Sequence, residues 1–520
     1  MKNINKYIIV ALSALLVWSC DEKDKLIEES LNNNPDITVP PPSGDAGSLD
    51  LSTYVSIGAS FTAGAMDNAL YTHGQNNSFP VLLAQQFEAD GVGGGAFNVP
   101  DINSVNGYSG VNEEDGSIEG KLILDLDLNN DGELGDAGII ASDGEIPGAF
   151  AGDKSTLNNF GVPGIQTAQL LTPFTGGPAE GNPAYNPLYA RFASDPGMST
   201  IIEDAVARNP TFFTLWTGGN DVLGYAASGG TNDAILTDPG AFEAYFNGAL
   251  LQLLNVGEAL GVVMDIPNVL ALPFFQAVPY NAIPLTDQAI VDATNGAYAE
   301  YNGGVQAALA NMIITPEEAA LRTISFDIGA NAIVIMDDDL TDVETLSGGL
   351  IPIPKLRQLQ PTPDPVNIPS NELVLLPAST ILGTLADPMD PNSIIGVGVP
   401  LDDEYSLTFN EIGNIITHLT AFNTTIGTAA ATYSDRVMHF STYELLLSII
   451  ADGGYNKGTA GFNLLYDFSP NGIFSNDGIH VNTRGHAIIA NEIMEDLNER
   501  FGADLPMLDV MQYNASPFQQ

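Results

Sequence analysis

An acid and an imidazole lie three positions apart near the C-terminus, where "SNDGIHVNTRGH" contains Asp477 and His480. The whole chain has only five histidines. On a turn, this spacing lets the carboxylate hydrogen-bond to the imidazole and stabilise the imidazolium that forms when the ring takes a proton from a nucleophile. Asp-Gly is also ordinary turn chemistry. The pair therefore predicts a general base only if the rest of the chain supplies a nucleophile.

Further fragments place reactive or polarising groups after expected strands. Ser60 follows the apolar run "TYVSIG" and is either a nucleophile or a helix cap. "NNFGVPGIQT" offers the backbone N–H of Gly164, and "LWTGGND" offers the side-chain amide of Asn220, as donors to an oxyanion. Taken alone, each fragment could also be an ordinary turn or a helix cap without a role in chemistry. Together they would supply a nucleophile, a base, an acid that orients it, and oxyanion donors.

The elements that must position these groups follow an alternating pattern. Apolar strand patterns occur at 53–58, 211–216, 261–267 and 436–441. Helical patterns occur at 78–90, 199–207, 241–260, 407–433 and 442–454. Strands separated by helices pair in parallel. The sequence therefore predicts an α/β fold, a doubly wound (flavodoxin-like) three-layer sandwich with a central parallel sheet. In such sheets the site lies where strands end and helices begin.

Two segments interrupt this alternation inside a domain expected over 49–510, with a tail over 511–520. Residues 103–154 are rich in Asp, Gly and Asn, and residues 337–402 are rich in Pro and Leu. We expect both to be large loop insertions near the edge or the mouth of the sheet, where long loops shape binding sites.

The first insertion contains an acidic motif, "DLNNDGELGDAG". Asp127, Asn129 and Asp131 resemble the start of a calcium-binding loop, but Gly138 stands where such a loop needs a bidentate Glu. The alternative is a solvated acidic loop. Apart from this calcium candidate, the sequence predicts no cofactor.

The N-terminus has the pattern of an export signal. Lys2 and Lys6 precede an apolar run that is too short to span a bilayer and ends before Cys20. Residues 1–19 resemble a bacterial lipoprotein signal peptide, which implies lipidation of Cys20. Residues 20–48 are polar and Pro-rich, as in a flexible tether. We expect an exported lipoprotein attached to the outer membrane by its lipid; the acids that follow Cys20 could direct it to the cell surface.

The charge balance excludes one class of partner. The chain has 15 Lys and Arg against 64 Asp and Glu, a formal net charge of -49. Such a surface repels phosphate backbones, so we expect no nucleic-acid partner. Cys20 is the only cysteine, and the fold must therefore be stable without disulfides.

The four site fragments, taken in order, resemble the blocks of the SGNH (GDSL-like) hydrolase superfamily. The matching residues are Ser60 in "GASFTAG", Gly164 in "NFGVPGIQT", Asn220 in "GGND", and Asp477 and His480 in "DGIH". Ala59 departs from the family, which usually carries Asp there. The resemblance implies a Ser60–His480–Asp477 triad and an oxyanion hole made by Ser60, Gly164 and Asn220.

The activity implied by this resemblance is hydrolysis of carboxylic esters through an acyl-enzyme on Ser60. The substrate would be an ester of a lipid or an acetylated glycan. Two alternatives stay open: a non-catalytic carbohydrate-binding or scaffold lipoprotein on a degenerate hydrolase fold, and an acyltransferase that uses a sugar acceptor.

Overall fold

The computed structural model describes residues 42–112, 115–125, 138–361, 371–459 and 461–515. Contacts divide the chain into two compact units, Met1–Ser43 and Gly44–Gln520, and all of the elements given below belong to the second. Cys20, the predicted signal peptide and the calcium candidates Asp127, Asn129 and Asp131 lie outside the described residues. No helix in the described ranges is both long enough and apolar enough to span a bilayer.

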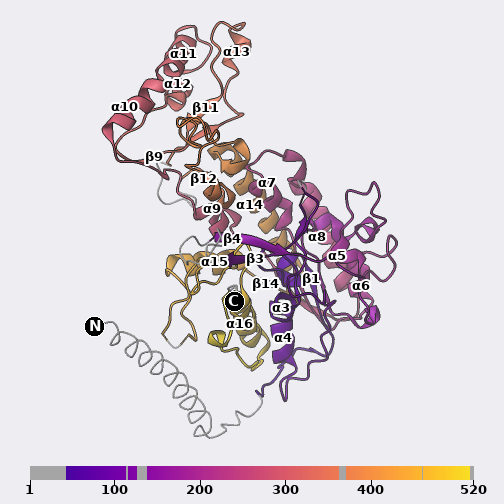
Figure 1. Ribbon diagram of the computed structural model, residues 1–520. Helices are drawn as coiled ribbons and strands as arrows, with labels where there is room; N and C mark the ends of the chain where they lie inside the picture. The colour runs from indigo at the N-terminus through magenta and orange to yellow at the C-terminus, as the bar shows by residue number, and fades with distance from the viewer. Residues whose placement is uncertain (1–41, 113–114, 126–137, 362–370, 460, 516–520) are drawn as a thin grey trace, which may run out of the picture. The chain divides into compact units, whose positions relative to one another are not determined.

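A five-stranded parallel sheet lies at the centre of the second unit, as the sequence predicts for an α/β fold (Figure 1). In the order β14-β7-β6-β1-β5, its strands are β14 (Val437–Phe440), β7 (Leu260–Met264), β6 (Phe212–Trp216), β1 (Tyr54–Gly58) and β5 (Asn159–Gly161). The predictions of β1, β6, β7 and β14 are confirmed. β5 is not among the strand ranges predicted above, because three residues are too few to show a strand pattern.

Burial explains why these sequences form the sheet. Every residue of β1 and of β6 is buried, as expected for parallel strands that are covered on both faces. Val55, Ile57, Phe213, Leu215 and Val263 have no exposed surface and belong to one large apolar cluster. Each such side chain contributes about 1.5–3 kcal/mol when it leaves water.

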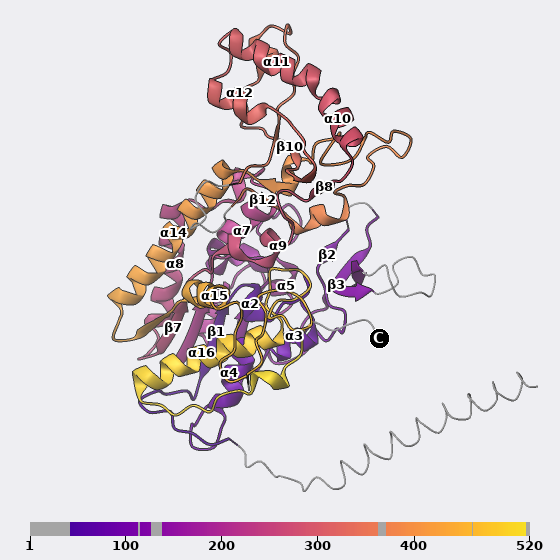
Figure 2. The ribbon, with the colours of Figure 1, turned by 90° about the vertical axis from the view of Figure 1, so that its left-hand side faces the viewer.

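The helices of this region form packed groups around the sheet. α4 packs against α16, as Figure 2 shows, and α8 packs against α6 and α14. The predicted helices 78–90, 199–207, 241–260, 407–433 and 442–454 are confirmed as α4, α6, α8, α14 and α15. The helices are α2 (Ser60–Ala63), α3 (Thr72–Asn76), α4 (Phe79–Phe87), α5 (Pro187–Ala190), α6 (Ile201–Val206), α7 (Asn220–Ala227), α8 (Pro239–Leu254), α9 (Pro273–Gln276), α14 (Phe409–Thr432), α15 (Thr442–Ala451) and α16 (Thr483–Phe501).

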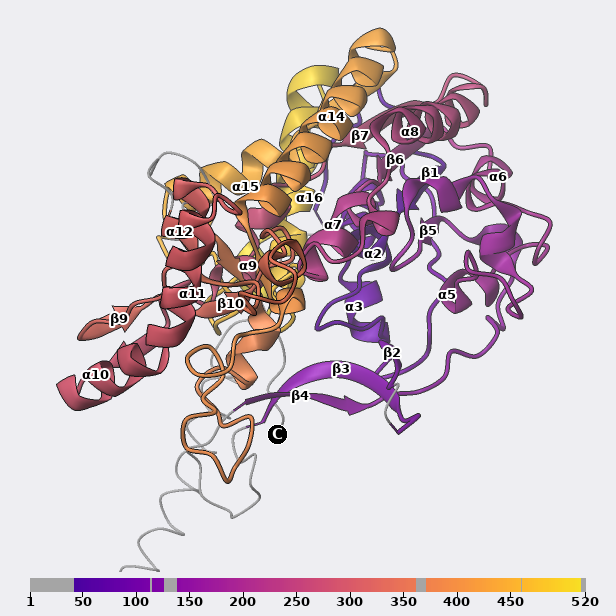
Figure 3. The ribbon, with the colours of Figure 1, turned by 90° about the horizontal axis from the view of Figure 1, so that it is seen from above.

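The first predicted insertion, 103–154, contains a small antiparallel sheet in the order β2-β3-β4 (Figure 3). Its strands are β2 (Gly110–Val111), β3 (Ile118–Asp125) and β4 (Gly138–Asp143). The Leu122 N–H donates to the backbone oxygen of Asp67 (2.7 Å), and the Leu122 oxygen accepts from the Asn476 side chain (3.3 Å). The small sheet therefore contacts both the turn after α2 and the loop before His480.

The second predicted insertion, 337–402, lies within a longer segment, residues 278–407, which we call the second insertion. It has two apolar clusters of its own, and α11 lies beside α12 in Figures 1 and 2. Its elements are β8 (Ile283–Leu285), α10 (Gln288–Ala297), α11 (Ala299–Ala310), α12 (Pro316–Arg322), β9 (Gly329–Asn331), β10 (Val334–Met336), α13 (Val343–Leu346), β11 (Leu356–Gln358), β12 (Leu373–Val374) and β13 (Ser406–Leu407).

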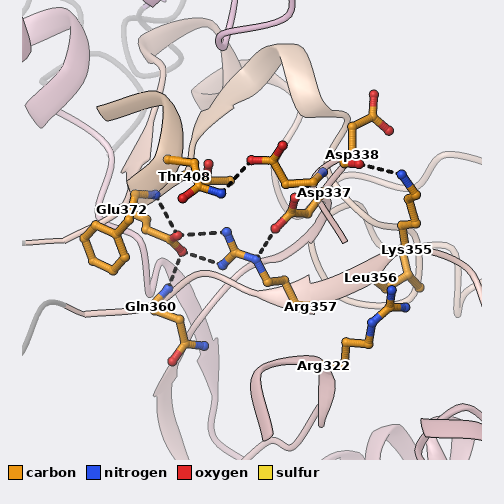
Figure 4. A network of polar contacts seen from close by, with 12 residues as sticks. Arg322, Asp337, Asp338, Lys355, Leu356, Arg357, Gln360, Glu372 and Thr408 are labelled. Atoms are coloured by element: carbon orange, nitrogen blue, oxygen red, sulfur yellow. Dashed lines mark hydrogen bonds and ion pairs between the residues drawn. The ribbon is translucent and has the colours of Figure 1, made fainter. Parts of the chain in front are cut away.

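A buried ion network lies inside the second insertion (Figure 4). Arg357 donates through both terminal nitrogens to Glu372, at 2.5 and 2.8 Å, and through Nε to Asp337. Glu372 also accepts from the backbone N–H of Gln360 (2.8 Å) and of Phe409 (3.0 Å), the first residue of α14. The network therefore links the second insertion to a helix of the sheet region, by which we mean the described residues within 44–277 and 408–515.

Candidate active site

Asp477 and His480 form a hydrogen-bonded pair in the loop before α16. Nδ1 of His480 lies 2.7 Å from one carboxylate oxygen of Asp477, and the other oxygen accepts the N–H groups of Ile479 and His480 at 2.8 Å each. Burial by itself would raise the pKa of Asp477, but the His480 ring and the backbone donors outweigh burial and hold this pKa below its ordinary value. The carboxylate therefore stays ionised beside the imidazole.

The loop that carries this pair is fixed by backbone contacts. Gly478 has φ +69°, which favours glycine, and its carbonyl accepts from the Phe274 N–H of α9 at 3.0 Å. A Cβ on Gly478 would lie 2.9 Å from that nitrogen and 3.4 Å from the side chain of Leu376, in a 3₁₀ helix of the second insertion. The second insertion therefore packs directly behind the Asp477–His480 turn.

A second support of the pair is the Asp67–Asn68 turn, which the sequence analysis missed. The Asn68 N–H donates to Asp477 at 2.6 Å, and the Asp67 carboxylate accepts from the Asn476 N–H at 2.9 Å. Asp67 and Asn68 have φ +51° and +61°. Asp and Asn tolerate that region, so "DN" is a visible turn signal. Nothing in it indicates contact with a loop that lies about four hundred residues away along the chain.

Ser60 lies where β1 ends, as predicted, and is the first residue of α2. The helix cap is Ala59, and Ser60 makes no side-chain hydrogen bond to any described residue, so the capping interpretation of Ser60 is wrong. As the first helical residue, Ser60 has a backbone N–H with no acceptor inside the helix. Both its hydroxyl and its N–H are available to a ligand.

Ser60 and His480 line the same cleft, without a hydrogen bond between their side chains. The cleft has a volume of ≈ 480 Å³. Hydrogen bonds between a nucleophile and its base are often long in unliganded sites and shorten when the substrate binds. The arrangement is therefore compatible with proton transfer from the Ser60 hydroxyl to His480 during attack on a carbonyl.

Gly164 and Asn220 also line this cleft. Gly164 has φ +78°, and its N–H meets no acceptor in the described part of the chain. Asn220 begins α7 at the end of β6, and its side-chain amide donates to the Ile165 carbonyl at 2.9 Å. That bond fixes the orientation of the amide and uses one of its two N–H groups. The second N–H has no hydrogen-bond acceptor among the described residues and can donate to a ligand.

Asp221 joins the two segments that carry these donors, a role the sequence analysis did not assign. One of its oxygens accepts both the N–H and the hydroxyl of Thr167, at 2.9 and 2.8 Å, and the other accepts from the Thr237 hydroxyl at 2.8 Å. Burial raises the pKa of this carboxyl. Asp221 therefore ties Thr167, in the segment that follows Gly164, to the start of α7.

The position of the cleft follows from the strand order. β1 lies between β5, the next sheet strand in the chain, and β6, the one after it, so the direction of the order reverses at β1. Parallel sheets bind ligands outside the carboxyl ends of their strands at such a switch point. Ser60 follows β1 and Asn220 follows β6.

His486 is the one other histidine in the C-terminal fragment, and it lies outside the cleft. It has no exposed surface, and its Nδ1 accepts the N–H of Phe79 at the start of α4 (3.2 Å). Burial lowers the pKa of His486 to about 3, so the ring is neutral at pH 7. Its role is to hold α4 against α16.

The described residues contain no group of three or more His, Cys, Asp or Glu side chains arranged to hold a metal ion. The calcium candidates Asp127, Asn129 and Asp131 are outside those residues, so that prediction stays a prediction. Comparison of the chain with protein-family models, curated proteins and solved structures finds no match.

Proposed function

We propose that this protein is a serine ester hydrolase that cleaves carboxylic esters through an acyl-enzyme on Ser60. The observation that carries the proposal is the Asp477–His480 pair, with 2.7 Å between carboxylate and imidazole, whose histidine lines the same cleft as Ser60, Gly164 and Asn220. These residues come from four distant segments, and each has a distinct part in acyl transfer.

In the proposed mechanism the Ser60 hydroxyl attacks the ester carbonyl while Nε2 of His480 takes its proton. Asp477 holds the ring through Nδ1–H and stabilises the imidazolium. The negative charge on the former carbonyl oxygen is met by the N–H groups of Ser60 and Gly164 and by the Asn220 side chain. His480 then protonates the leaving alkoxide. Water, deprotonated by His480, attacks the acyl-enzyme and releases the acid and free Ser60.

The sheet topology supports the finer fold prediction. Numbered in chain order, the five strands run 2-1-3-4-5, which is the order of doubly wound, flavodoxin-like sheets. The proposed site lies at the switch point of that order. Membership of the SGNH (GDSL-like) superfamily rests on the four sequence blocks and on this placement. Lipidation of Cys20, export and attachment to the outer membrane stay predictions that rest on the N-terminal sequence alone.

The test is ester turnover and covalent trapping of the purified protein. Ser60→Ala should lower hydrolysis of p-nitrophenyl acetate by about 10⁴-fold or more and abolish labelling by a fluorophosphonate. Ser448→Ala is the matched control, because Ser448 is an exposed serine of α15 whose hydroxyl donates to the Leu445 carbonyl at 2.8 Å and which lines neither hollow at Ser60. Ser448→Ala should keep both turnover and labelling.

Two outcomes would contradict the proposal. Turnover and labelling that survive in Ser60→Ala would remove Ser60 from the chemistry. A folded parent protein with no turnover on any ester would favour the non-catalytic lipoprotein. Product analysis with and without a polyol acceptor separates hydrolysis from acyl transfer, because only transfer forms a new ester.

A further inference from the structure

Two hollows of very different size meet at Ser60. Ser60 and Asn220 line the wide cleft of ≈ 480 Å³ and also a narrow pocket of ≈ 40 Å³. The pocket is otherwise lined mostly by apolar side chains, among them Phe61, Trp216, Leu223, Val269, Leu272 and Ile479. The Trp216 ring nitrogen donates to the backbone oxygen of Asp265, at 3.0 Å, so this side chain presents only its apolar surface to the pocket.

The chemistry of ester cleavage assigns one half of the substrate to each hollow. The leaving alcohol must lie against His480, because this residue protonates it. His480 lines the wide cleft and not the narrow pocket. The alcohol half therefore occupies the cleft, and the narrow pocket is left for the hydrocarbon part of the acyl group.

The narrow pocket limits the acyl group to a short chain. Its ≈ 40 Å³ is room for roughly three water-sized groups, or an acyl group of about two to four carbons. Phe61 and Trp216, whose ring centroids are 4.6 Å apart, lie with Leu272 between this pocket and a second apolar hollow of ≈ 50 Å³. The second hollow is space that a longer chain would reach only if this wall were opened.

The wide cleft has the chemistry of a binding site for a hydroxylated ring. Beside apolar side chains, its lining includes Tyr108, Asn68, whose amide donates to the Ser109 hydroxyl, and Asn186, whose amide donates to the Pro163 carbonyl. Each of these amides has a second N–H that can donate to a ligand. Tyr108 also borders a neighbouring hollow of ≈ 340 Å³, where Tyr185 presents a second aromatic ring. Amides and hydroxyls exchange hydrogen bonds with sugar hydroxyls, and aromatic faces pack against the apolar faces of sugar rings.

We infer that the substrate is a short-chain acyl ester of a bulky hydroxylated alcohol, such as an O-acetylated sugar or oligosaccharide. This inference rests on the proposed ester hydrolysis at Ser60. The acyl group enters the Phe61–Trp216–Leu272 pocket, and the sugar lies along the cleft from His480 toward Tyr108 and Tyr185.

The acyl half is tested with p-nitrophenyl acetate, butyrate and octanoate, which share one alcohol. The parent kcat/KM should fall by about tenfold or more from butyrate to octanoate. Leu272→Ala should join the two apolar hollows and raise the octanoate-to-acetate ratio by about tenfold. Leu419→Ala is the control, because Leu419 is 4% exposed against 3% for Leu272, lies in the same apolar cluster and lines none of these hollows.

A second variant works in the opposite direction if Leu272→Ala fails to fold. Val269 lines the narrow pocket and not the cleft, so Val269→Phe should fill this pocket and leave the cleft open. The substitution should lower kcat/KM for butyrate more than kcat/KM for acetate. A parent enzyme that prefers octanoate, or a chain-length profile that neither variant changes, would overturn the acyl assignment. If Ser60→Ala still abolished turnover in that case, the esterase proposal would stand and only the acyl assignment would be wrong.

The alcohol half is tested with acetyl esters of two alcohols, an acetylated xylo-oligosaccharide and hexadecyl acetate in micelles. The parent enzyme should have the higher kcat/KM on the sugar ester, and Tyr185→Ala should raise KM for it by about tenfold with little change in kcat. Preference for the hexadecyl ester would overturn the sugar assignment in favour of a lipid. A parent protein with no turnover on any ester would refute the proposed function itself.

Discussion

The sheet region and the second insertion are stabilised in different ways. The sheet region has one large apolar cluster in which whole strands, β1 and β6, are buried. The second insertion has two smaller apolar clusters and, beside them, the buried Arg357–Asp337–Glu372 network. Apolar packing is spread over many contacts, whereas an ion network fails when a single partner is removed. Stability in the second insertion should therefore depend on far fewer residues.

The two regions also contribute differently to the proposed chemistry. Ser60, Gly164, Asn220, Asp477 and His480 all belong to the sheet region. Among the described residues, the second insertion supplies none of these groups, and Leu376 lies behind Gly478 in the loop that carries His480. Substitutions in the sheet region can therefore remove activity without unfolding the protein. Substitutions in the second insertion should lower stability and leave the activity of the folded protein unchanged.

The largest expected effect on stability comes from Arg357→Ala. The change leaves Asp337 and Glu372 buried without their cation, which costs about 3–5 kcal/mol. Hydrogen exchange should accelerate in β10, β11 and α11 and stay slow in β1 and β6. Arg436→Ala is the control from the sheet region, because the Arg436 guanidinium donates to the carbonyls of Leu254 and Ala259 and forms no ion pair with a described residue. Equal acceleration in both regions would show that they unfold as one unit.

Asn220→Ala should have the largest effect on activity without unfolding, after changes in the proposed triad. Loss of one oxyanion donor lowers turnover by about 10²–10³-fold. We expect the melting temperature to stay close to that of the parent. Asn302 in the second insertion is the matched control, because it exchanges two hydrogen bonds with the backbone of Ile324, at 2.8 and 3.0 Å, far from the cleft residues in sequence. Asn302→Ala should lower stability and keep turnover. If Asn302→Ala lowered turnover and kept stability, the two regions would not differ in the way described above.

The buried histidine makes the sheet region sensitive to acid. The His486 pKa is about 3 in the folded protein and about 6.5 in the unfolded chain, so unfolding takes up a proton between these values. The stability is fully present above about pH 6.5 and is lost as the pH falls. From pH 7 to pH 5 this group should cost about 2 kcal/mol.

The measurement is urea unfolding of the parent protein and of His486→Gln at both pH values. The parent should lose about 2 kcal/mol more than the variant over this interval, because glutamine does not titrate. The difference between the two proteins isolates His486 from the many carboxylates. Equal losses would show that His486 is not kept neutral by burial.

The smallest expected loss of stability comes from Gly478→Ala, which should lower both stability and turnover. Gly478→Ala forces an L-residue to φ +69°, which costs about 1–2 kcal/mol, and its Cβ would meet the Phe274 nitrogen. Displacement of the His480 loop should also lower turnover by about tenfold or more. Gly383 in the second insertion has φ +76° and no atom within 4 Å of an added Cβ. Gly383→Ala should cost similar stability and leave turnover unchanged.

The sequence predicted the ends of β1 and β6 and the helices around the sheet because these elements have strong apolar patterns. It missed β5, whose three residues are too short to show one. All six strands given for the second insertion are equally short, with two or three residues each, which is why the sequence indicated only part of that segment. Arg357 was not singled out, because a charged residue is normally expected on the surface and only its partners make burial possible.

Local sequence patterns were enough to predict the candidate site residues and the strand ends that carry them. Which groups meet depends on the fold: the Asp67–Asn68 turn lies against Asp477, Asp221 joins the two segments of the proposed oxyanion donors, and the narrow pocket lies beside Ser60. These contacts join positions far apart along the chain. Their geometry depends on how the layers pack, which local periodicity does not encode.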